Sequence, residues 1–189
     1  MRVPGTGSRR LRRRHTAWAV ATLLVGGLVG CSVEQTLPPP YCETSGSGLI
    51  VAQSVPSATQ IPCLADLPAG WSVSTVKVNE HHSVVTLDSD RAGDGAAVLR
   101  FEDACDVSAA VSTPSELLPA ERYDAIEQVR PSFRAERFYV FDGGCVYWTF
   151  DFDVGVSATQ SVAIGDTLSL VSRNDLQRSI SETFLDEEI

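Results

Sequence analysis

The stretch "ERFYVFDGGCVYWTFDFDV", residues 136–154, carries the clearest structural pattern in the chain. Its centre, Asp142–Gly144, tolerates positive φ angles, so the flanking segments are expected to be two strands joined by a tight hairpin. Side chains alternate in the second strand, and one set is apolar throughout: Val146, Trp148, Phe150, Phe152 and Val154. Because alternate side chains of a strand point to opposite faces, one face of this hairpin should be core and the other wet.

Three earlier segments have a similar composition: "WSVSTVKV" from Trp71, "SVVTL" from Ser83 and "AAVLRFEDAC" ending at Cys105. They are rich in β-branched and aromatic residues and are separated by turn residues, which predicts three further strands.

Other apolar segments suggest helices. In "PAERYDAIEQVR", residues 119–130, the proline suits a first helical turn and apolar residues recur at helix-like spacing, although strand alternation fits nearly as well. A helix stripe is expected through Ile164, Leu168 and Val171, and "SRND" from Ser172 is typical of a capping box that opens another helix. The predicted fold class is α+β: an antiparallel sheet of about five strands with C-terminal helices packed on it, and two disulfides.

Basic residues are concentrated at the N-terminus, where the first thirty residues contain six arginines and no acid. The apolar run Thr16–Gly30 would span roughly 22 Å as a helix, against about 30 Å for the hydrocarbon core of a bilayer. It is short for a permanent span, and its basic start and small residues at the end are typical of a secretory signal. The stretch "SRRLRRR" leaves twin-arginine export open beside the general route.

The apolar run ends in "LVGC", Leu28–Cys31, which resembles the lipobox of bacterial lipoproteins. The resemblance implies a diacylglyceryl group on the Cys31 thiol, cleavage between Gly30 and Cys31, and a lipid anchor on the outer face of the cell membrane. An uncleaved anchor and ordinary signal cleavage are the alternatives. We therefore expect a signal peptide at 1–30, a lipidated cysteine and flexible tether at 31–47, and one extracytoplasmic domain at 48–189.

The four other cysteines are even in number, which outside the cytoplasm predicts two disulfides. They allow three pairings, and we favour two of the bonds. Cys42 with Cys63 would tie the tether to the domain, and Cys105 with Cys145 would join two predicted strands.

Composition limits the classes of partner. Without its first thirty residues the chain has nine basic and 24 acidic residues, a net charge of −15. Such a field repels nucleic acid and anionic headgroups. We expect the membrane, through the lipid on Cys31, and an envelope protein as partners.

Asp151 and Asp153 are the best candidates for a site, because on a strand they would share one face as paired carboxylates of a hydrolase would. A solvated strand face is the alternative. No phosphate loop, dinucleotide fingerprint or nucleophile motif occurs, so no cofactor is expected.

Three further clusters are weaker candidates. His81 and His82 would point to opposite faces of a strand, which favours a polar turn over a metal site. "DSDRAGDG", from Asp88, departs from the calcium-loop pattern and favours an acidic turn. Arg130, Arg134 and Arg137 form a small basic island that we interpret as a salt-bridged surface.

The segments "VPSATQIPC", "LPAGW", "LDSDRAG" and "GGCVYWTF" resemble a pattern in uncharacterised envelope proteins of high-GC Gram-positive bacteria. That resemblance implies a location and no activity. The function we expect is a lipid-anchored, non-enzymatic binding or accessory module; the alternatives are a small envelope hydrolase using the Asp151 and Asp153 carboxylates, or a lipid or small-molecule carrier.

Overall fold

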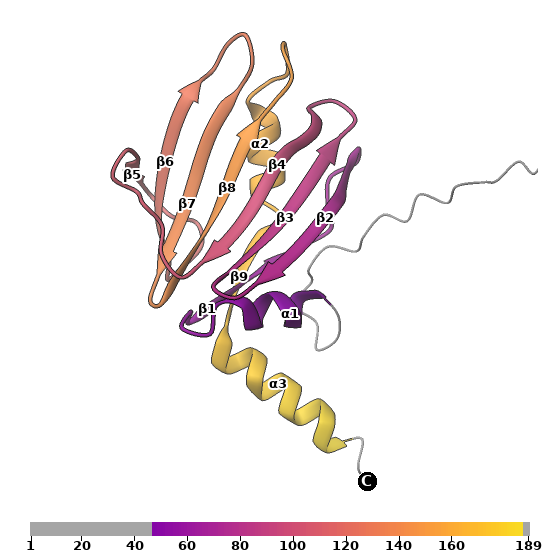
Figure 1. Ribbon diagram of the computed structural model, residues 1–189, viewed down its shortest axis with the longest axis vertical. Coiled ribbons are helices and arrows are strands. Elements are labelled where there is room, and N and C mark those ends of the chain that lie inside the picture. The colour runs from indigo at the N-terminus through magenta and orange to yellow at the C-terminus, as the bar shows by residue number, and fades with distance from the viewer. Residues whose placement is uncertain (1–46, 187–189) are drawn as a thin grey trace, which may run out of the picture. The chain divides into compact units, whose positions relative to one another are not determined.

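The computed structural model describes residues 47–186, where nine strands and three helices follow one another along the chain (Figure 1). In order, these elements are α1 (Ser47–Ser54), β1 (Gln60–Leu64), β2 (Trp71–Asn79), β3 (His82–Ser89), β4 (Gly93–Glu102), β5 (Val111–Thr113), β6 (Glu121–Gln128), β7 (Arg134–Phe141), β8 (Gly144–Asp151), α2 (Thr159–Gly165), β9 (Leu168–Ser172) and α3 (Arg173–Asp186).

Seven strands form one antiparallel sheet in the order β2-β3-β4-β8-β7-β6-β5, and β1 pairs with β9 in a separate two-stranded sheet. The helix α2 and the β1–β9 pair lie on one face of the large sheet (Figure 1). Their apolar residues, Ile164 of α2 and Ile61 and Leu64 of β1, join Trp148 and Phe150 of β8 in one hydrophobic core.

The expected hairpin is confirmed. β7 and β8 are antiparallel neighbours, and Phe141 pairs with Gly144 across a two-residue turn. Gly143 adopts a φ of 73°, and a Cβ at this position would collide with the carbonyl oxygen of Ser57. Glycine is therefore required at this turn by both backbone geometry and space.

The two faces of β8 also differ as expected. Val146, Trp148, Phe150 and Phe152 are buried, whereas the Asp151 side chain on the other face is exposed. Val154, also expected in the core, lies beyond the end of β8 and is 76% exposed. The three predicted strands between Trp71 and Glu102 are confirmed as β2, β3 and β4. The broad α+β class is thus correct.

The sheet has seven strands and not the expected five, because the short strand β5 is unexpected and the segment 119–130 contains the strand β6 instead of a helix. Its backbone is paired on both edges, with β5 and with β7. As a strand, the segment also places Asp124 directly opposite Arg137 of β7. These tertiary pairings decide between two local patterns that fit the sequence about equally well.

The helix stripe expected through Ile164, Leu168 and Val171 is wrong as well. α2 ends at Gly165, and Leu168 and Val171 belong to β9, where they pair with Leu64 and Ile61 of β1. A strand partner contributed from far along the chain overrides the helical spacing. The following helix is confirmed, since α3 begins at Arg173, directly after Ser172.

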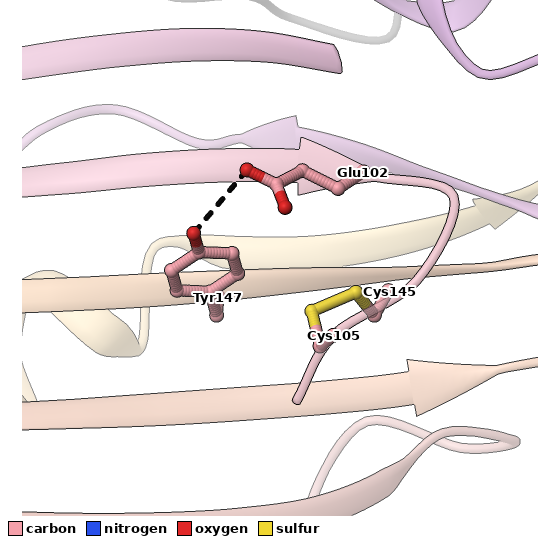
Figure 2. Close-up of a disulfide and its surroundings, with 4 residues drawn as sticks. All are labelled: Glu102, Cys105, Cys145 and Tyr147. Atoms are coloured by element: carbon pink, nitrogen blue, oxygen red, sulfur yellow. Dashed lines mark hydrogen bonds between the residues drawn. A yellow bond between two sulfur atoms is a disulfide. The ribbon is translucent and has the colours of Figure 1, made fainter. Parts of the chain in front are cut away.

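One disulfide, not two, is present among the described residues. It joins Cys105, in the loop after β4, to Cys145 of β8, as favoured from the sequence (Figure 2). The pairing of Cys42 with Cys63 stays a prediction, because Cys42 lies outside residues 47–186.

The expected signal peptide, the lipobox-like stretch that ends in Cys31 and most of the expected tether also lie outside the described residues. Within residues 47–186, no helix is both long enough and apolar enough to cross a membrane.

Candidate functional site

A groove of about 650 Å³ lies between α2 and the β5–β6–β7 side of the large sheet. Its apolar lining includes Ile126 of β6, Phe133, Phe150 of β8 and Val162 of α2. On the same strands, charged side chains occupy core-facing positions: Asp124 is paired in register with Arg137, and Arg122 with Tyr139. The groove therefore combines apolar walls with a charged floor.

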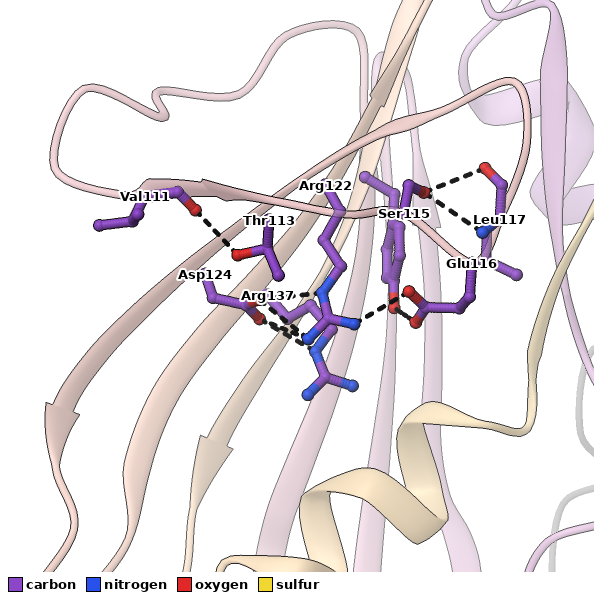
Figure 3. A network of polar contacts seen from close by, with 9 residues as sticks. Val111, Thr113, Ser115, Glu116, Leu117, Arg122, Asp124 and Arg137 are labelled. Atoms are coloured by element: carbon purple, nitrogen blue, oxygen red, sulfur yellow. Dashed lines mark hydrogen bonds and ion pairs between the residues drawn. The ribbon is translucent and has the colours of Figure 1, made fainter.

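The floor is a chain of alternating charges (Figure 3). Arg122 Nη1 donates to Glu116 Oε2 at 2.9 Å, and Arg122 Nε donates to Asp124 Oδ2 at 2.9 Å. Asp124 Oδ1 then accepts from Arg137 Nε at 3.1 Å. Tyr139 closes the other end by donating its hydroxyl proton to Glu116 Oε1 at 2.6 Å.

Burial and pairing act in opposite directions on these groups. Burial raises the pKa of Glu116, but hydrogen bonds from Tyr139 and Arg122 outweigh it and leave this pKa below its ordinary value. Burial likewise lowers the pKa of Arg122, and its bonds to Glu116 and Asp124 more than restore it. The pKa of the Tyr139 hydroxyl is raised, first by burial and then by its bond to Glu116. The ionised network is therefore favoured at neutral pH.

Arg137 is the open end of this chain. Its side chain is only 11% exposed, its guanidinium carbon lies 5.9 Å from the centre of the Phe150 ring, and only its Nε bonds to Asp124. Nη1 and Nη2 donate to no group among the described residues. The only fully buried side-chain nitrogen or oxygen without a partner there is Trp148 Nε1, so neither terminal nitrogen of Arg137 is a fully buried, unpaired donor, and the residue lines the groove.

A second groove, of about 840 Å³, adjoins the first, because Ala158 lines both. It is formed by the loop after β6 and the loop after β8, which lie together at one end of the sheet (Figure 1). Six large apolar side chains are strongly exposed within the described part of the chain. Five of them line one of the two grooves, and the sixth, Leu118, lines neither. The other five are Val111, Ile126, Val129, Val154 and Val162. Exposed apolar surface is thus concentrated along these two grooves.

The Asp151 and Asp153 carboxylates lie elsewhere. β8 ends at Asp151, whose exposed side chain accepts from Arg134 Nε at 3.0 Å. Asp153 follows the strand, and its carboxylate packs against the backbone of Gly93. Both residues line a small depression on the surface, so the pair is solvated and Asp151 has a cationic partner.

The weaker candidates form turns. His81 occupies the turn between β2 and β3 with a φ of 71°, and His82 begins β3. Asp88 Oδ1 accepts hydrogen bonds from Gly95 N and Ser74 Oγ, at 2.7 and 3.0 Å, and thereby fastens the turn between β3 and β4. No cluster of three or more potential metal ligands occurs within residues 47–186.

The basic island separates on folding. Arg134 and Arg137 are three positions apart on β7 and therefore point to opposite faces, Arg134 toward Asp151 and Arg137 toward Asp124. Arg130 lines the second groove instead. The salt-bridged interpretation holds for two of the three arginines.

Sequence reasoning missed the floor of the first groove. Glu116, Arg122 and Asp124 were not singled out, because charged residues are not expected on the core side of a strand. The available signal was the alternation of Arg122, Asp124 and Ile126, which becomes informative only once the segment is assigned as a strand.

Comparison of the chain with models of protein families, with curated proteins and with solved structures finds no match.

Proposed function

We propose that this protein is a non-enzymatic binding module of the bacterial envelope, held at the outer face of the membrane by lipid on Cys31, and that the two grooves beside α2 are its binding surface. The concentration of five of six exposed large apolar side chains along these grooves supports the proposal. Apolar patches of this kind on a soluble domain mark interaction sites more often than scattered apolar residues do.

The charged residues in the floor suit binding better than catalysis. Both oxygens of Asp124 accept hydrogen bonds from guanidinium groups, and both oxygens of Glu116 are bonded, to Arg122 and Tyr139. A general base needs a free oxygen within reach of a substrate proton. The network instead fixes the shape and polarity of the groove.

Site-specific photo-crosslinking in the intact envelope tests the binding surface. A photoreactive amino acid in place of Ile126, in the first groove, should give one discrete adduct, whose mass identifies a small molecule or a protein. Leu118 is the matched control, because it is 83% exposed and lies outside both grooves. An absence of adducts at Ile126, or equal adducts at both positions, would overturn the proposal.

The location has a separate test. Cys31→Ser removes the thiol that the lipobox resemblance assigns to lipid, so the variant should accumulate as a precursor and take up no radioactive fatty acid. Undiminished labelling of the variant would show that Cys31 is not the attachment site.

A further inference from the structure

We propose that the first groove takes an amphipathic small molecule with a single carboxylate, and that Arg137 binds this carboxylate while the apolar body follows the groove. This inference rests on the proposed function, because it names the ligand class of the same surface. Charge order, guanidinium geometry and groove size support it.

The alternation of positive and negative side chains in the floor of the groove favours an anion beside Arg137. Glu116, Arg122, Asp124 and Arg137 alternate in sign, and the Glu116 end is closed by Tyr139. The Arg137 end is open. A carboxylate placed there would continue the alternation, whereas a cation would face a guanidinium that is itself only partly neutralised.

The Arg137 guanidinium is already positioned for such a bond. Asp124 holds Nε, the guanidinium carbon lies over the Phe150 ring, and a Cβ on Gly165 would lie only 2.6 Å from Nη1. The side chain is therefore confined between β6, β8 and α2. Its two terminal nitrogens remain for a bidentate bond, the arrangement in which arginine recognises carboxylates most strongly.

Size and net charge restrict the rest of the ligand. A groove of about 650 Å³ falls within the range of small-molecule sites, and the second groove adjoins it at Ala158, with Val154 and Val156 in its lining. The acidic chain, with a net charge of −9, disfavours polyanions. One carboxylate on an apolar body meets both conditions.

Photoaffinity labelling of the purified full-length protein tests the inference. Two probes share an alkyl chain of about ten carbon atoms with a diazirine, and end in either a carboxylate or a hydroxyl group. The carboxylate probe should label peptides of β6 and α2 at a concentration about tenfold lower than the alcohol. The difference should vanish below about pH 4, where the probe is protonated.

Variants of two arginines on the same strand locate the effect. Arg137→Met should abolish the preference for the carboxylate and leave labelling by the alcohol unchanged. Arg137→Lys should retain part of the preference, because lysine keeps the positive charge but lacks the paired donors of a guanidinium group. Arg134→Met is the matched control, since Arg134 is ion-paired to Asp151 on the opposite face, and should behave as the unmodified protein. Gly165→Ala keeps every charge but displaces the guanidinium, and should also reduce the preference.

The outcomes separate the two proposals. Labelling of the groove by both probes without a carboxylate preference, or a preference that survives Arg137→Met, would overturn this inference and leave the binding surface intact. Labelling of the groove by neither probe would overturn this inference alone, because the binding surface is decided separately by the crosslinks at Ile126.

Discussion

Asp124 and Arg137 face each other across β6 and β7, on the side of the sheet that elsewhere holds the hydrophobic core, and Arg137 Nε donates to Asp124 Oδ1 at 3.1 Å. Their side chains are only 19% and 11% exposed. Partly buried charges are tolerated when each has a partner, and here one carboxylate serves two guanidinium groups.

Asp124→Asn should destabilise the fold, because it removes the shared negative charge and leaves Arg122 and Arg137 facing each other. The expected loss is about 2 kcal/mol in the free energy of unfolding, measured by urea denaturation. Asp151→Asn removes a carboxylate from an exposed ion pair and should cost less than about 1 kcal/mol. Equal losses in the two variants would contradict the role given to Asp124.

The same pair shows why the sequence predicts the central strands better than the groove. The alternation in β8 is unambiguous because its inward residues, Val146, Trp148 and Phe150, are apolar and its turn requires glycine. In β6 the inward residues Arg122 and Asp124 are charged, so the pattern of apolar residues does not show that this segment is a strand or which of its faces points to the core. Their partners, Glu116 and Arg137, lie in other segments, and only the folded chain brings them together.

Arg173 joins the two ends of the described chain. At the start of α3, its side chain donates to the carbonyl oxygens of Ala58, Ala52 and Val55, at 2.6, 3.0 and 2.6 Å. Two of these carbonyls lie at and just beyond the C-terminal end of α1, where backbone acceptors have no partner within the helix.

Arg173→Met should therefore cost about 2 kcal/mol of unfolding free energy, measured by thermal or chemical denaturation. Arg178→Met is the control, because Arg178 forms only an exposed pair with Asp175 within α3, and its loss should be below about 0.5 kcal/mol. A stability of Arg173→Met indistinguishable from that of the control would contradict the role of Arg173.

The Cys105–Cys145 disulfide closes a loop with a sequence separation of 40. Replacing both cysteines by serine should lower the free energy of unfolding by about 3 to 4 kcal/mol, since the crosslink restricts the unfolded chain. Peptide mapping without reduction should recover Cys105 linked to Cys145, and should also show the predicted link of Cys42 to Cys63. Recovery of Cys105 linked to either of the latter two would refute the pairing.

Tyr147 is expected to make the free energy of unfolding depend on pH in the alkaline range. Burial, followed by the nearby charge of Glu102, raises the pKa of its hydroxyl to about 12, from an ordinary value of 10.0. The unfolded state therefore loses this proton first, so the stabilising contribution is complete below about pH 10 and decreases as the pH rises toward 12.

Tyr147→Phe should accordingly flatten the loss of stability between about pH 10 and 12, measured by urea denaturation at each pH. Tyr123→Phe, at a half-buried tyrosine on β6 whose hydroxyl donates to Glu121, should have a smaller effect. An unchanged slope in Tyr147→Phe would show that this hydroxyl does not carry the dependence.

Hydrogen–deuterium exchange of the protein, in native membranes and after purification, tests the central claim most directly, because it needs no knowledge of the ligand. If the grooves are the binding surface, amides of β6 and α2 should exchange more slowly in the membranes, while those of β2, at the opposite edge of the sheet, should not change. Equal exchange of β6 and α2 in both preparations, or protection confined to other strands, would contradict the account.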